Sequence, residues 1–259
     1  MGRVRCCPLQ VLGLMAALLS AFFTDATAAE TERTYTIALE SHYAPYEYRN
    51  AQGELVGFEV ELLNAIAQEQ GLKLKLEEHI FDKATSLVVA GELDGVGGGC
   101  VLTGDRKRTF SVTEPYMKAG LGLMYNRSLL GRELSGPEQL TGRKVCVETG
   151  SLGHRYVRSR NNLEMVTFYR IDDALEAFNQ GHCHAMVCDY HLLDYYIRSG
   201  TVPKGQLLSE RLTNVDYGFL INKQRTELTE QLNAGLKELR ESGELDRLKR
   251  KWFAHAEQE

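Results

Sequence analysis

Hydrophobic and polar positions along the chain switch between two periods and repeat one order of elements twice. In the first half, strand-like runs at 34–39, 72–76 and 93–96 enclose helical patterns at 58–70 and 84–90, which end at Gly71 and Gly91. In the second half, strands at 144–147, 164–168 and 185–188 enclose helices at 152–160 and 173–180. Asp172 is the expected N-cap of the last helix, and Gly181 its end. Each half is therefore predicted to form one βαβαβ lobe.

The repeated units predict an α/β fold with two lobes joined by a two-strand hinge. Strands connected through helices give parallel sheets covered on both faces, and their carboxyl ends share one edge, where ligands bind. Residues 226–253 predict two amphipathic helices broken at Gly243. They are expected to return to the first lobe, because the strand-like run 215–221 offers a second crossing. The predicted lobes are 30–117 plus 216–259, and 118–215, with the hinge near 116–120 and 214–218.

The N-terminal residues predict a secretory signal. Arg3 and Arg5 precede an apolar run, 11–23, that is too short for a membrane helix, and small residues suited to cleavage follow at 26–28. We expect a cleaved signal peptide over 1–29 and a periplasmic protein. The four cysteines beyond it, Cys100, Cys146, Cys183 and Cys188, are too few for a disulfide scaffold. A straight strand would hold Cys183 and Cys188 apart, whereas a Cys146–Cys188 bond between neighbouring strands stays open.

Composition and motifs exclude several function classes. The formal net charge of −5 gives no basic footprint for nucleic acid. The run Gly97-Gly98-Gly99 lacks the continuation of a phosphate-binding loop and indicates close backbone approach beside a cleft. His184 and Cys188 would lie about 13 Å apart on an extended strand, so they do not share a metal ion. Neither a cofactor nor a metal is predicted.

Positions just past the predicted strand ends carry an amphoteric set of side chains. Arg106 could bind a carboxylate, the helix that starts near Ser151 offers backbone N–H groups to the same anion, and Asp189 could accept an ammonium group. Aromatic side chains that could enclose an apolar or planar part are Tyr43, Tyr46 and Phe81. Taken singly, each has an ordinary structural explanation, such as N-capping of helix 190–199 by Asp189. Their clustering matches an α-amino acid.

Five segments carry a family resemblance. They are Tyr43-Ala44-Pro45-Tyr46-Glu47, Gly57-Phe58-Glu59-Val60-Glu61-Leu62, Gly91-Glu92-Leu93-Asp94-Gly95, Thr103-Gly104-Asp105-Arg106 and Thr113-Glu114-Pro115-Tyr116. With Gly150-Ser151, Asp189 and 243–252, they resemble the bacterial extracellular solute-binding proteins of family 3. These are the polar amino-acid binding components of ABC importers, and the resemblance implies a two-lobed, type II periplasmic-binding-protein-like fold.

The resemblance also implies roles for individual residues. Arg106 would hold the ligand α-carboxylate with help from Ser151, and Asp189 would hold the α-ammonium. The side-chain pocket would be lined by Tyr43, Tyr46 and Phe81, with Glu40 meeting a polar or cationic end unless backbone groups satisfy it. Gly99 and Thr103 complete the expected ligand-binding set. Val101 and Leu152 stand where the family commonly has hydroxyl residues, which leaves room for a related carboxylate ligand.

The protein is therefore expected to bind a ligand without catalysing a reaction on it. A monomer would bind a small amino acid, with a polar or cationic side chain favoured, and deliver it to the membrane permease of an ABC importer. Two alternatives stay open. One is an enzyme similar to cyclohexadienyl or arogenate dehydratase, in which Glu40, His42, Glu148 or His154 would be a general acid. The other is a sensor protein that presents its closed form to a receptor.

Overall fold

The computed structural model describes residues 1–2 and 33–253. Residues 34–253 belong to one compact unit, and the description below concerns that unit. The predicted signal peptide, 1–29, lies outside the described residues except for its first two positions, and stays a prediction. In the described part of the chain, no helix combines the length and apolar character needed to cross a membrane.

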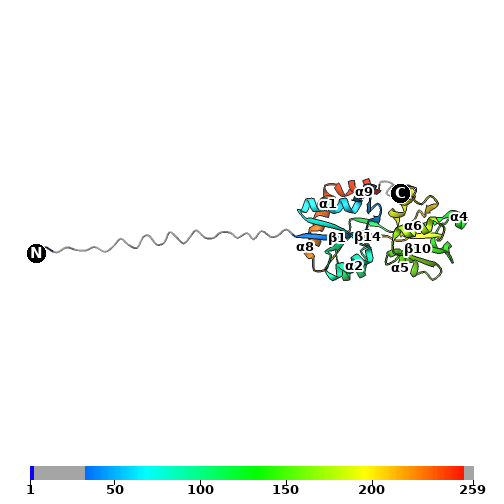
Figure 1. Ribbon diagram of the computed structural model, residues 1–259, viewed down its shortest axis with the longest axis horizontal. Helices are drawn as coiled ribbons and strands as arrows, with labels where there is room; N and C mark the ends of the chain where they lie inside the picture. Colours follow the sequence, from blue (N-terminus) through cyan, green and yellow to red (C-terminus); the bar gives the residue numbers. More distant parts are fainter. Residues whose placement is uncertain (3–32, 254–259) are drawn as a thin grey trace. The chain divides into compact units, whose positions relative to one another are not determined.

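Two mixed sheets form the two lobes (Figure 1). The first sheet has the order β5-β1-β6-β15-β7 and the second the order β11-β10-β12-β9-β13. The strands of the first are β1 (Thr34–Leu39), β5 (Lys73–Glu78), β6 (Gly95–Val96), β7 (Ser111–Val112) and β15 (Leu220–Ile221). Those of the second are β9 (Leu121–Asn126), β10 (Lys144–Glu148), β11 (Glu164–Phe168), β12 (Ala185–Asp189) and β13 (Gly205–Leu207). The two-lobed α/β prediction is confirmed.

The predicted all-parallel sheets are wrong in one respect. In each lobe the three strands of the βαβαβ unit are parallel, but β15 lies antiparallel to β6, and β9 lies antiparallel to β12. Both exceptions follow a crossing between lobes instead of a crossover helix. A strand that arrives from the other lobe can enter the sheet from the opposite end, which the right-handed crossover rule does not govern.

Helices cover both faces of each sheet. In the first lobe they are α1 (Phe58–Gln70), α2 (Phe81–Ala90), α3 (Gly104–Thr109), α8 (Thr226–Glu241) and α9 (Glu244–Phe253). In the second they are α4 (Arg127–Leu130), the 3₁₀ turn η1 (Pro137–Leu140), α5 (Leu152–Arg158), α6 (Ile171–Asn179) and α7 (Tyr190–Arg198). Alternation along β1 shows the two faces: Ile37 and Leu39 pack in the cluster of α1 and α8, and Ala38 in that of α2.

The C-terminal helices return to the first lobe, as predicted. Gly235 of α8 comes so close to α1 that a Cβ atom there would lie 2.7 Å from Cγ2 of Ile66. Gly243 separates α8 from α9 with a φ of 78°, a left-handed conformation that glycine adopts without strain. This packing fastens the end of the chain to its first helix.

Two short strands connect the lobes. β8 (Met117–Ala119) pairs antiparallel with β14 (Val215–Tyr217), and Figure 1 places β14 between the two sheets. These are the segments in which the sequence predicted the hinge. The remaining strands, β2 (His42–Tyr43), β3 (Glu47–Arg49) and β4 (Leu55–Val56), form a small antiparallel sheet of their own after β1.

Most helix ends fall within a few residues of their predicted positions, but one cap is wrong. Helix α6 begins at Ile171, so Arg170 occupies the N-cap position that Asp172 was expected to fill. The Asp172 carboxylate instead lies 2.7 Å from Nδ1 of His42, in the first lobe. A contact distant in sequence has replaced the local one.

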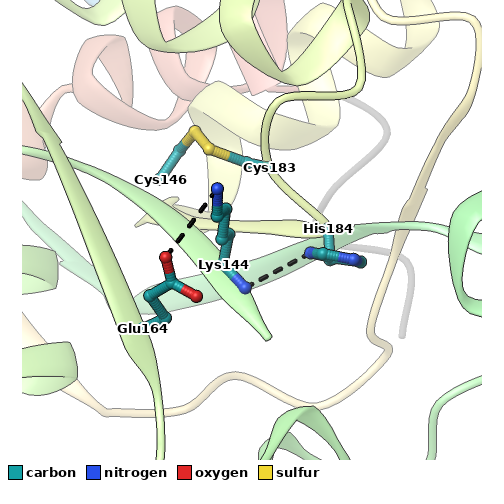
Figure 2. Close-up of a disulfide and its surroundings, with 5 residues drawn as sticks. All are labelled: Lys144, Cys146, Glu164, Cys183 and His184. Atoms are coloured by element: carbon teal, nitrogen blue, oxygen red, sulfur yellow. Dashed lines mark hydrogen bonds and ion pairs between the residues drawn. A yellow bond between two sulfur atoms is a disulfide. The ribbon is translucent and has the colours of Figure 1, made fainter. Parts of the chain in front are cut away.

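A disulfide joins strand β10 to the segment that precedes β12 in the second lobe. Figure 2 shows Cys146 of β10 bonded to Cys183, with Cα atoms 5.9 Å apart. The Cys146–Cys188 bond left open from the sequence does not form, and Cys188 is a buried thiol. The register explains this, because Met186 lies opposite Cys146 and Cys188 is two residues further along. Cys183 precedes β12 and is free of its pleat.

Replacing both Cys146 and Cys183 with alanine should lower the free energy of unfolding by about 2–4 kcal/mol, because the bond closes a long loop in the unfolded chain. Urea denaturation measures this. The matched control is dithiothreitol, which should destabilise the unchanged protein by a similar amount and leave the double variant unaffected. Equal stability of all three samples would show that the bond contributes nothing.

Candidate ligand-binding site

A cavity lies between the lobes where the carboxyl ends of both parallel strand sets meet. We call it the inner cavity. Its lining from the first lobe and from β14 is Glu40, Tyr43, Phe81, Gly98, Gly99, Val101, Arg106 and Tyr217. Its lining from the second lobe is Leu121, Glu148, Ser151, Leu152, Gly153, Cys188 and Asp189. Both lobes therefore contribute charged, polar and apolar surface to one space.

Arg106 supplies the positive charge of the inner cavity. It sits in the short helix α3, where its backbone N–H donates to the hydroxyl of Thr103, the N-cap residue, at 3.3 Å. Nη1 donates to the carbonyl of Val101 at 3.0 Å, and the guanidinium lies 4.9 Å from the ring centre of Phe81. Among the described residues no carboxylate forms an ion pair with it. These contacts fix the guanidinium as a site for an external anion.

Asp189 supplies a negative charge from the opposite lobe. It ends β12 and caps α7, so one carboxylate oxygen accepts from the N–H of Leu192 at 2.9 Å. The same oxygen accepts from the hydroxyl of Tyr46 at 3.2 Å, and the other accepts from the hydroxyl of Tyr217. The residue is 2% exposed. Asp189 therefore caps α7, as the sequence suggested, while it also lines the inner cavity.

Aromatic rings surround the charged groups. Tyr43 and Phe81 line the inner cavity, and the hydroxyl of Tyr43 lies 3.7 Å from Sγ of Cys188. Burial raises the pKa of Tyr43 well above its usual value, so this hydroxyl keeps its proton. Tyr46 is fully buried and packs edge-on against Phe58. It orients Asp189 from behind and does not line the cavity.

A buried acid fixes the backbone of two glycines in the cavity lining. Glu59 of α1 accepts from the N–H groups of Gly98 and Gly99 at 2.7 and 2.6 Å, and from the hydroxyl of Tyr116. Gly98 and Gly99 have φ values of 100° and 59°, which other residues rarely adopt. A Cβ atom at Gly99 would lie 3.1 Å from the ring of Tyr217. The close backbone approach expected here is confirmed.

Two carboxylates line both the inner cavity and a larger one. The outer cavity, about 210 Å³ against about 40 Å³, is lined by Glu40, Ser41, His42, Glu78, His79, Ile80, Glu148, Arg170 and Ile171. Only Glu40 and Glu148 line both. Glu40 follows β1 and accepts from the N–H of Phe81 at 2.8 Å, so a backbone group does satisfy one of its oxygens. Glu148 ends β10, in the other lobe.

Burial makes both of these acids hard to ionise. It raises the pKa of Glu40 to about 7, although the N–H of Phe81 and the charge of Arg170 oppose the shift. Burial also raises the pKa of Glu148 well above its usual value, and the negative charge of Glu40 adds to the effect. A cation placed between the two carboxylates would stabilise their ionised forms and so offset the cost of burying them.

The structure brings seven of the nine predicted residues into the inner cavity. They are Glu40, Tyr43, Phe81, Gly99, Arg106, Ser151 and Asp189. Tyr46 and Thr103 support Asp189 and Arg106 from outside it. Val101 and Leu152 do line it, so their apolar side chains face the ligand space where the family pattern has hydroxyls. Ser151 caps α5 by accepting from the N–H of His154 at 3.0 Å.

The predicted set left out two lining residues with polar side chains that matter here, Glu148 and Tyr217. Glu148 was named only as a possible general acid, yet it ends an apolar strand as Asp189 does, and that signal placed it at the same sheet edge. Tyr217 lies in the crossing strand β14. It reaches the cavity only because the chain returns between the lobes, which no local pattern indicates.

Two α/β lobes, paired crossing strands and an amphoteric cavity between them define a two-lobed solute-binding protein. The chain belongs to the bacterial extracellular solute-binding proteins, family 3, whose model matches residues 35–255. It is 26% identical to the putative ABC transporter arginine-binding protein 2 of Escherichia coli (strain K12), over 93% of this chain and 98% of that protein.

Solved structures give the same picture. An ancestral arginine-binding protein bound to arginine aligns with a TM-score of 0.80 and 26% identity, over 86% of this chain and 99% of that one. An ancestral amino acid-binding protein, a precursor of cyclohexadienyl dehydratase, aligns with a TM-score of 0.78 and 26% identity, over 85% and 95%. The type II fold expected from the sequence is confirmed.

Replacing Glu59 with glutamine should lower the free energy of unfolding by about 1–3 kcal/mol, because the amide loses one acceptor against three donors. Ligand affinity should fall as well, since Gly98 and Gly99 lose their anchor. Chemical denaturation and titration calorimetry measure the two effects. The control is Glu69→Gln, an exposed acid of the same helix, which should change neither. An equally mild effect at both positions would contradict this role of Glu59.

Proposed function

We propose that this protein captures a small amino acid with a polar or cationic side chain between its lobes and delivers it to the permease of an ABC importer. One observation carries the proposal: Arg106 and Asp189, opposite charges from opposite lobes, line the same cavity. An α-amino acid is the smallest common ligand that presents a carboxylate and an ammonium group together. Arg106 would bind the former and Asp189 the latter.

The side chain of the ligand would run from the inner to the outer cavity. That path passes Glu40 and Glu148, and the outer cavity offers the greater volume. Two acids at this point favour a cationic group over an anionic one. The arginine-binding relatives agree with this preference.

Closure would follow from contacts that the ligand makes with both lobes. The hinge lies at β8 and β14 in this proposal, so that the lobes are 30–117 plus 216–259, and 118–215. Since Arg106 and Asp189 lie on opposite sides, a zwitterion interacts fully only with the closed form and shifts the population toward it. Export through a cleaved segment at 1–29 to the periplasm and a monomeric state complete the proposal.

An enzyme on the same fold is the second candidate. Glu148 is buried and borders the cavity with a raised pKa, as a general acid requires, and one structural neighbour is a precursor of a dehydratase. Incubation with prephenate or arogenate separates the two functions. Release of carbon dioxide and water from these substrates would establish an enzyme. Unchanged substrate would instead support ligand binding and delivery as the function.

The direct test is a thermal-shift screen of refolded protein against the amino acids, keto acids, dicarboxylates and prephenate. A ligand at 100 times its dissociation constant adds about 2.7 kcal/mol of stability, which raises the melting temperature visibly. A rise with one or a few amino acids is expected. A rise confined to prephenate, or none at all, would overturn the proposal.

Replacing Arg106 with alanine should weaken amino-acid binding by at least about 100-fold, because a carboxylate would be enclosed without its charged partner. Titration calorimetry measures the change. The matched control is Arg108→Ala in the same helix, whose side chain is 75% exposed and pairs with Asp105. Near-normal affinity of the Arg106 variant would rule out this carboxylate site.

Asp189→Asn should weaken α-amino acids more than the matching α-hydroxy or α-keto acids, because asparagine keeps one oxygen to cap α7 but removes the charge. The loss of the oxygen that accepts from Tyr217 affects both ligand classes, so the ratio between them reports the charge. Dissociation constants for both ligand classes give the ratio. Asp194→Asn, further along α7, serves as the control, since its partner is Arg198 on the same helix. An unchanged ranking of ligands would argue against recognition of the ammonium group.

A further inference from the structure

Glu40 and Glu148 are a pair of acids that we call the acidic neck. Each comes from a different lobe, and each lines both cavities. A ligand that extended from the inner to the outer cavity would therefore pass these two residues. The neck exists as a pair only when the lobes are together, because β1 and β10 belong to separate sheets.

The two acids face an environment that adds negative charge. Acidic neighbours that oppose their ionisation are Asp82 of α2, Asp172 of α6 and, behind Glu40, the fully buried Glu47 of β3. Glu78 lines the outer cavity but pairs with Arg49. Two adjacent carboxylates in such a place do not both ionise readily, and they titrate as a pair that shares a proton.

The positive groups nearby are engaged or peripheral. Arg170 lowers the pKa of Glu40 but lies 2.9 Å from Nε2 of His42 and 3.5 Å from Asp172. Arg106 binds the Val101 carbonyl at the far side of the inner cavity. His79 pairs with Glu77 at 3.3 Å, and His154 accepts from the N–H of Gly150. None of these contacts is made to Glu40 or Glu148.

We propose that the acidic neck holds one proton more when it closes around a neutral side chain than when it closes around a cationic one. Glu148 is then a specificity-determining residue, and selectivity for cations over neutral ligands increases with pH. The inference rests on the proposed function, because it assigns proton-linked specificity to the same site. The proton leaves a neck carboxyl for solvent, and the ligand cation replaces its charge.

The comparison of two closed complexes makes this linkage measurable. If the neutral complex carries one proton more than the cationic complex, the ratio of their affinities changes about tenfold per pH unit. The state of the open protein cancels from that ratio. Arginine and citrulline are suitable probes, because they have the same α groups and nearly the same shape and differ in side-chain charge.

Titration calorimetry of the protein with both ligands at pH 5.5, 6.5 and 7.5 tests the proposal. The ratio of the citrulline to the arginine dissociation constant should rise about tenfold per unit while the neutral complex keeps its extra proton, and should begin to flatten near the raised pKa of Glu40, about 7. In buffers of different ionisation enthalpy at pH 6.5, citrulline should take up about one more proton than arginine.

Glu148→Gln should flatten the dependence of the ratio on pH and reduce the preference for arginine while citrulline still binds. Glu164→Gln is the control, an exposed acid at the far end of the neighbouring strand that pairs with Lys144, and it should keep the full slope. A ratio that is constant with pH in the unchanged protein overturns the inference alone. A pH dependence of the ratio that persists in Glu148→Gln but vanishes in His42→Asn also overturns the inference. Failure of every amino acid to bind overturns the proposed function instead.

Discussion

The Asp189 carboxylate is the interaction on which the arrangement of the site depends. A buried charge is tolerated only when its oxygens are satisfied, and here the donors come from three places: the start of α7, Tyr46 of the first lobe, and Tyr217 of the crossing strand. One group therefore caps a helix of the second lobe while it accepts hydroxyls from the first. The same contacts that stabilise the charge bring the lobes into register around the cavity.

Glu59, on the other side of the cleft, is a second buried carboxylate whose oxygens need hydrogen-bond donors. It too is buried with three donors, two of them the backbone N–H groups of Gly98 and Gly99. These glycines follow β6, at the carboxyl edge where Glu40 follows β1. Glu59 thus supports the cavity wall from behind, whereas Asp189, Glu40 and Glu148 line the cavity itself.

Local patterns sufficed for the parts of the structure that local physics determines. Gly71 and Gly91 end their helices in the left-handed conformation, as their positions after the periodic runs predicted. The sheet-edge rule correctly predicted that Arg106 and Asp189 lie around one cavity. What it missed is non-local: Asp172 binds His42 across the cleft instead of capping α6, and Cys146 pairs with a residue outside the strand. Contacts between residues far apart in the sequence leave no trace in its hydrophobic periodicity.

In the proposed function, the distribution of charge places ligand specificity between the lobes and not within either one. Each lobe alone presents an incomplete set, with Arg106 and Glu40 on one side and Asp189 and Glu148 on the other. Closing these surfaces together leaves three acids and one arginine in a space shielded from water, which is unfavourable until a ligand adds cationic charge. A zwitterion alone adds none in total, whereas a cationic amino acid adds one unit beside Glu40 and Glu148. In the proposed function, the protein's own buried charges therefore select for the charge of the ligand.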